Sequence, residues 1–135
     1  MRILENPHAS DAAEITSVVP ASTVSDMVAL VSTVHVDPSI NDYIARIVEG
    51  TREASEVRLG ASVRAALALV RSTRALAASA GRAFVIPDDV KALAEAVLAH
   101  RLVLDPEAEF DGVTPSSVVS RVLIDTPPPQ DQGAR

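Results

Sequence analysis

Residues 60–102 read GASVRAALALVRSTRALAASAGRAFVIPDDVKALAEAVLAHRL, and this stretch decides the fold. Apolar residues recur at helical spacing in two segments, 62–80 and 87–101. Gly81 follows the first segment, and glycine commonly ends a helix because it accepts a positive φ. Pro87 suits the first position of a helix, where its missing amide hydrogen would have no partner. The stretch therefore predicts two packed helices joined by a short extended link at 84–86.

The flanking sequence predicts three more helices. Because Ala, Leu and Val surround segment 62–80 on nearly all sides, we expect it to be the central and most buried helix. Asp37 can cap a helix that starts at Pro38 and ends at or just before Gly50. Its apolar face consists of Ile40, Tyr43, Ile44, Ile47 and Val48. A helix is also expected over 22–34, and a last one after Thr114 and Pro115, with Val118, Val119, Val122 and Leu123 inward.

The composition fits an all-α bundle of about five helices. The 135 residues are the size of one domain, and 47% of them are hydrophobic, but only one Tyr and two Phe are present. The core must therefore be built mainly from Ala, Val, Leu and Ile. We predict a helical domain over 22–125, with room for one very short strand pair between 34–36 and 84–86. Residues 1–21 are expected to be an irregular leader and 126–135 a disordered tail.

Charge and residue usage argue against several functions. Eighteen acidic and twelve basic residues give a net charge of -6, which disfavours nonspecific nucleic-acid binding. The chain has no cysteine for disulfide or thiol chemistry, and His35 and His100 lack the neighbouring carboxylates or cysteines of a metal site. No apolar run approaches the roughly 18 residues that span a bilayer, and no signal-peptide pattern begins the chain. We therefore expect a soluble cytoplasmic protein without a metal site.

The chemically most informative residues are Gly60-Ala61-Ser62-Val63-Arg64. A glycine turn leads to Ser62, which can cap the following helix, and Arg64 then lies in the first helical turn. A positive charge there opposes the helix dipole and costs a few tenths of a kcal/mol unless an anion compensates. Arg64 could be a surface residue paired with a carboxylate such as Glu56, or it could bind an anionic ligand. Ser62 has no evident general base, so we interpret it as a cap rather than a nucleophile.

Several short motifs between about Val34 and Leu104 resemble the lid subdomain of MoxR-type AAA+ ATPases. They are Thr51-Arg52, Gly60-Ala61-Ser62-Val63-Arg64, Gly81-Arg82, Pro87-Asp88-Asp89-Val90 and His100-Arg101. The family pattern usually reads GASPRA, then GR, then TPEDV or PDDV, then HR. This chain departs from it at Val63, where proline is usual, and at Ile86, where a polar cap is common. Neither change removes a ligand group, but Val63 leaves the helix start less rigid.

The resemblance implies a role for Arg64 as the sensor 2 residue, which reaches the γ-phosphate of ATP held by an ATPase core. Gly60, Ala61 and Ser62 would lie beside it at the nucleotide. The chain itself carries no GxxxxGK loop, because its only lysine, Lys91, follows Pro-Asp-Asp-Val. It is therefore not expected to be an enzyme on its own: ATP and Mg²⁺ would bind a core in the same polypeptide, with residues 1–21 as the linker.

The family also implies partners and a wider function. Such lids belong to rings of subunits, expected to be hexamers, that remodel or mature client proteins, often with a von Willebrand A type partner. Two alternatives remain open: a free-standing acidic helical module that binds proteins, and a histone-like helix–strand–helix module, which the acidic charge disfavours.

The remaining charged residues receive no catalytic role. Five further arginines could line a nucleotide or a neighbouring subunit, but such a row is more often a solvated face: Arg52, Arg58, Arg71, Arg74 and Arg82. Asp88 and Asp89 fit the positive end of a helix dipole, and Arg101 fits the negative end. His100 is either a helix-end cation or a buried packing group.

Overall fold

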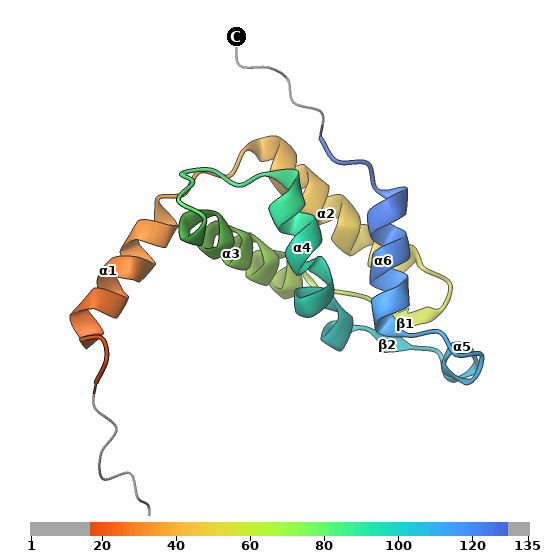
Figure 1. Cartoon of the computed structure of the whole chain (residues 1–135). Helices are drawn as coiled ribbons and strands as arrows, with labels where there is room; N and C mark the ends of the chain where they lie inside the picture. The colour runs from red at the N-terminus through yellow and green to blue at the C-terminus, as the bar shows by residue number, and fades with distance from the viewer. Residues whose placement is uncertain (1–16, 130–135) are drawn as a thin grey trace, which may run out of the picture.

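The computed structural model describes residues 17–129 and is mostly helical (Figure 1). The helices are α1 (Ala21–Ser32), α2 (Pro38–Glu53), α3 (Val63–Ser79), α4 (Pro87–Leu98), the 3₁₀ helix η1 (Ala99–Arg101), α5 (Pro106–Phe110) and α6 (Pro115–Asp125). The strands are β1 (Val57–Leu59) and β2 (Val103–Leu104). The prediction of an all-α bundle is confirmed. The leader predicted at 1–21 and the tail at 126–135 fall largely outside the described residues.

The core lies between α2, α3, α4 and α6, which pack against one another in Figure 1. Every apolar residue predicted for the inner face of α2 is buried, and so are Val118, Val119 and Val122 of α6. The expectation that α3 is the most buried helix is wrong. Only Ala65, Leu69, Thr73 and Ala77 of α3 are buried, whereas Leu67 is 52% exposed. An apolar residue on every side of a helix does not bury it when only one side meets other elements.

Helix α2 begins where the sequence predicts and ends later. The Asp37 carboxylate accepts a hydrogen bond from the amide of Ser39 (2.8 Å), which caps the helix. Gly50 does not end α2, because the helix continues to Glu53. Instead, Gly50 lets α6 approach closely: a Cβ at this position would lie 2.9 Å from Cγ1 of Val122. The glycine that looked like a stop signal is a packing contact.

The strand pair lies elsewhere than predicted. Segments 34–36 and 84–86 share only one parallel bridge, between His35 and Phe84, with His35 N donating to Ala83 O (2.8 Å) and Val85 N to His35 O (3.0 Å). The two-stranded antiparallel sheet is formed by β1 and β2, which pair Val57 with Leu104. These strands and α5 are five residues or shorter. Segments of that length carry too few side chains for a periodic pattern.

The link from α3 to α4 is fixed by an ion pair. Gly81, with φ of 72°, ends α3 as predicted. Both terminal nitrogens of the Arg82 guanidinium donate to the Asp89 carboxylate (2.6 and 2.8 Å), and Asp89 also accepts from the amide of Ile86 (3.0 Å). Burial raises the pKa of Asp89, but the hydrogen bonds from Arg82 and Ile86 outweigh it and hold that pKa below its ordinary value. Asp89 thus binds back to the amide at the cap position, while Ile86 itself supplies no side-chain cap.

Helix α1 forms within the predicted segment but buries no side chain. The predicted helix extended to Val34, whereas α1 ends at Ser32. Val34 and Val36, beyond the helix end, enter the core instead. None of the helices between residues 17 and 129 has the length and apolar character needed to cross a bilayer.

Candidate functional site at the start of α3

The turn that leads into α3 is held against the end of α2. The Thr51 hydroxyl accepts a hydrogen bond from Ala61 N (3.0 Å) and donates one to Val48 O (2.6 Å). The Arg52 Nε donates to Ala61 O (2.7 Å). Thr51 and Ala61 are fully buried, so the bonds of the Thr51 hydroxyl form away from water, whereas the bond from Arg52 is partly buried. Both peptide groups of Ala61 are therefore occupied within the chain, and the turn is fixed to α2.

Gly60 allows this close contact. A Cβ at Gly60 would lie 2.6 Å from Cγ and 2.7 Å from Cα of Arg52, and 2.8 Å from the carbonyl oxygen of Thr51. Two of these three atoms belong to the α2 backbone and cannot rotate aside. Any larger residue at position 60 would push the turn away from Thr51 and Arg52.

Arg64 lies in the first turn of α3, on the outside of the bundle. Ser62 takes the N-cap position, as predicted, but its hydroxyl makes no cap hydrogen bond, so the predicted side-chain cap is absent. The Arg64 side chain is exposed, and within residues 17–129 it has no hydrogen bond or ion pair. Glu56, the expected partner for a merely structural Arg64, binds Arg121 instead (2.6 and 2.8 Å). Arg64 is thus held at an uncapped helix N-terminus with its guanidinium free among the described residues.

Comparison with known protein families identifies the family of this chain. The family model described as "AAA lid domain" matches residues 49–122, which is more than half of the chain and includes the turn and Arg64. The chain belongs to the AAA lid domain family. Relatives named MoxR identify the type of lid: "Chaperone MoxR1" of Mycobacterium tuberculosis is 40% identical over 98 residues, which are 66% of this chain and 26% of that protein.

Other similar proteins agree. The "Uncharacterized protein YeaC" of Bacillus subtilis is 41% identical over 93 residues, 69% of this chain and 29% of YeaC. A crystal structure of a candidate ATPase from Cytophaga hutchinsonii matches with a TM-score of 0.80 and 26% identity, and the match covers 95% of this chain and 42% of that one. The chain thus spans less than a third of the length of these two curated relatives. The predicted resemblance to a MoxR-type AAA+ lid is confirmed.

Two of the five arginines that the sequence left without a role, Arg52 and Arg82, have structural partners. Arg52 fixes the turn and Arg82 fixes the start of α4, so neither belongs to a merely solvated face. Arg58 and Arg71 are exposed and make no ion pair in the part of the chain that the structure describes, while Arg74 carries a buried Nε without a partner. After the end of α4, Nδ1 of His100 lies 3.1 Å from the carbonyl oxygen of Ala96, and Nε of Arg101 donates to that of Val97 (2.9 Å). His100 is exposed rather than buried.

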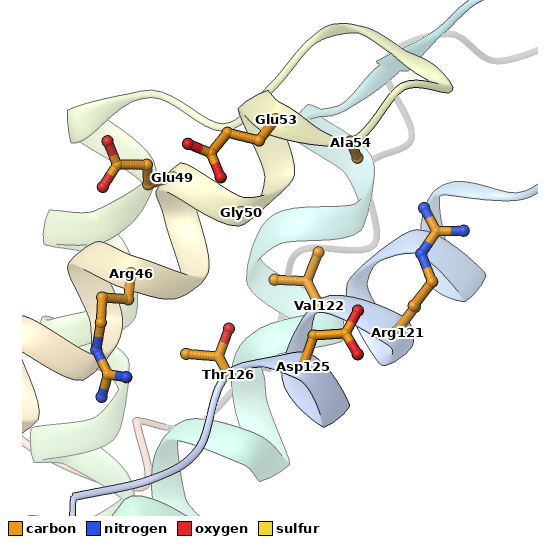
Figure 2. Close-up of a pocket in the computed structure, with 9 residues that line it drawn as sticks. All are labelled: Arg46, Glu49, Gly50, Glu53, Ala54, Arg121, Val122, Asp125 and Thr126. Carbon is orange, nitrogen blue, oxygen red and sulfur yellow. The ribbon is translucent and has the colours of Figure 1, made fainter.

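A hollow of about 390 Å³ lies between α2 and α6 (Figure 2), and Arg64 is not among the residues that line it. Its lining residues are Arg46, Glu49, Gly50, Glu53, Ala54, Arg121, Val122, Asp125 and Thr126. Both arginines are already engaged, Arg46 with Pro127 O (3.0 Å) and Arg121 with Glu56. Within the described ranges, no group of three or more His, Cys, Asp or Glu residues could hold a metal ion. The hollow therefore lacks the convergent groups of a catalytic site, and Arg64 remains the candidate.

The Glu56–Arg121 pair predicts how the stability of the lid depends on pH. The hydrogen bonds from Arg121 hold the pKa of Glu56 at about 2, against an ordinary 4.5. Because the folded pKa lies below the unfolded one, the contribution of Glu56 is present above about pH 4.5 and is lost as the pH falls toward 2. Glu56→Gln should therefore lower stability at pH 7, with a difference from the unmodified chain that vanishes near pH 2. Urea unfolding at a series of pH values measures this difference.

The matched control for this prediction is Glu107→Gln. Glu107 is exposed on α5 and forms no ion pair within 17–129. A pH-independent gap between the unmodified chain and Glu56→Gln would show that Glu56 contributes through packing rather than through its charge.

Proposed function

We propose that this lid closes over ATP bound by a nucleotide-binding core and that Arg64 contacts the terminal phosphate. The observation that supports this most directly is a free guanidinium in the first turn of a helix that no side chain caps. Both the guanidinium and the unpaired first amides of α3 favour an anion at this end of the helix. The match to the AAA lid family supports a nucleotide phosphate as that anion.

The chemistry of Arg64 fits a transferring phosphoryl group. A guanidinium donates two parallel hydrogen bonds to phosphate oxygens and stays charged at any physiological pH. Negative charge spreads over the equatorial oxygens in the transition state, so a fixed cation there accelerates transfer. In this role Arg64 is a catalytic residue. Ser62, the exposed residue just before α3, would lie near the same phosphate. Gly60 and Ala61 act by holding the turn rather than by free backbone groups.

The hydrogen bonds of Thr51 and Arg52 to Ala61, which we call the clamp, suit a mechanical role. Because Thr51 and Arg52 fix the turn to α2, a pull on Arg64 moves the helical bundle instead of bending the turn. A lid can be moved by nucleotide only to the extent that ATP and ADP states differ in contact energy. The contact between Arg64 and the γ-phosphate exists only before the phosphate leaves, so its loss would release the lid.

The other groups that bind and hydrolyse ATP would come from outside this lid. The 135 residues contain no GxxxxGK loop, so the core would supply the other phosphate contacts and the ligands of Mg²⁺, which neutralises phosphate charge when bound. We further propose a hexameric ring in the cytoplasm that remodels client proteins, in line with the name of one relative, "Chaperone MoxR1". A von Willebrand A type partner belongs to the same proposal.

Closure can be tested by energy transfer in the whole ATPase that carries this lid. The chain has no cysteine, so Ser120→Cys on the exposed side of α6 gives a single labelling position in the lid. With a second label on the core, an ATP analogue that resists hydrolysis should shorten the distance, and ADP should not. Arg64→Ala should remove the difference between the two nucleotides.

Arg71→Ala is the matched control for closure. Arg71 is exposed on the same helix face as Arg64, two turns further on, and should leave the response intact. A distance that responds equally to both nucleotides would contradict the proposal.

A further inference from the structure

Helix α1 presents an apolar face that is largely exposed in the described chain, and only Val31 at its end is half-buried. Val24, Met27, Val28 and Val31 follow helical spacing along one side, with Leu30 beside them, and we call these five residues the α1 face. Val24 is 51% exposed, Met27 54%, Val28 66% and Leu30 64%. Contiguous exposed apolar side chains on this scale mark an interaction site more often than an ordinary surface.

The helix has little to stabilise it apart from packing. A 12-residue helix is marginal in water, and three of the five face residues are β-branched valines. No side chain caps its N-terminus, and it has no acidic residue in the first turn or basic residue in the last. Although α1 touches α3, it buries none of its residues there. A stable α1 therefore requires cover from another body.

We infer that the nucleotide-binding core of the ATPase covers the α1 face, an inference that rests on the function proposed above. The match to the Cytophaga hutchinsonii structure covers 95% of this chain, which leaves too few residues uncovered to omit the 12 residues of α1 entirely. At least part of α1 therefore has a counterpart in that ATPase. The same match covers only 42% of that chain, so a larger body accompanies the lid. Asp26, the sole charged residue of α1, lies one turn before Leu30 at the edge of the α1 face, so the rest of the face, at Val24, Met27 and Val28, offers only apolar side chains to a partner.

This assignment places the hinge of the lid between α1 and α2. The helical bundle begins at Val34, which is buried, and His35 is fastened to Ala83 and Val85 by backbone hydrogen bonds. Figure 1 shows α1 projecting from the bundle, joined to it by a short link. If α1 stays with the core, Thr33 is the residue left between α1 and Val34, the first buried residue of the bundle. Movement of the lid would then change backbone angles around Thr33 and leave α1 in place.

Hydrogen exchange in the absence of nucleotide tests the inference. The exchange of α1 amides is compared between this chain alone and the same chain within the whole ATPase that carries it. We expect α1 to exchange at least tenfold more slowly in the ATPase, because a covered helix opens less often. Val28→Asp should remove this protection. Ile124→Asp should not, because Ile124 is also an exposed apolar residue (83%) but lies on α6.

Two outcomes would overturn the inference. Equal exchange of α1 in both samples would show that the core does not cover it. A concentration-dependent dimer of the chain alone in sedimentation, abolished by Val28→Asp, would identify a second copy as the occupant. Neither measurement involves nucleotide or Arg64. The proposed contact between the α1 face and the core can therefore be disproved without affecting the proposed role of Arg64, and the role of Arg64 can be disproved without affecting that contact.

Discussion

Replacing Arg64 with alanine is expected to lower the kcat for ATP hydrolysis by about 100-fold in the whole ATPase that carries this lid. Removing one preorganised donor to a developing charge typically costs this much. The loss should appear mainly in kcat rather than in KM, because the phosphate charge that Arg64 stabilises is greatest in the transition state. Steady-state turnover at saturating ATP measures the effect.

The fold should survive this substitution, since Arg64 is exposed and has no partner between residues 17 and 129. Circular dichroism and the melting temperature check this point. Arg64→Lys should recover only part of the activity, because lysine keeps the charge but loses the two parallel hydrogen bonds. Arg71→Ala should change kcat less than about twofold. A kcat for Arg64→Ala within threefold of the unmodified enzyme would exclude a phosphate contact and leave Arg64 as a surface residue.

The sequence predicted the position of α1 and α2 equally well but not what each helix packs against. Both segments repeat apolar residues at helical spacing, and both form helices. The face of α2 is fully buried, whereas that of α1 is exposed in this chain. Periodicity reports that a face is apolar and says nothing of the body that covers it. For the same reason, α3 with apolar residues all round was wrongly expected to be the most buried helix.

The candidate site could be only partly predicted. Arg64 stands out from local sequence alone, because a positive charge in the first turn of a helix is unfavourable without an anion. The clamp by Thr51 and Arg52 was missed, although the family pattern already pointed to this pair. Their hydrogen bonds join residues nine and ten positions apart through a turn, and neither helical nor strand periodicity covers such contacts. Likewise, no feature of the local sequence indicates that Glu56 pairs with Arg121, which is 65 residues away.

The second large effect is expected at Gly60. Gly60→Ala should destabilise the lid by about 2–3 kcal/mol, the usual cost of forcing extra volume into a packed place. The added Cβ would meet the backbone of Thr51 and Arg52 at 2.7–2.8 Å, so the turn itself must move. That shift would break the hydrogen bonds to Ala61 and displace Arg64. Urea unfolding of this chain measures the stability, and turnover by the whole ATPase measures the displacement.

Gly81→Ala separates this steric effect from glycine's conformational freedom. Gly81 has a positive φ of 72° and no atom within 4 Å of an added Cβ, so the change should cost only about 1 kcal/mol of backbone strain. It should also leave turnover unchanged, because Gly81 lies at the far end of α3 from Arg64. If Gly60→Ala costs no more than Gly81→Ala, the turn can move freely on α2. Arg64 would then not be rigidly aimed, and the mechanical coupling that we propose would lose its structural basis.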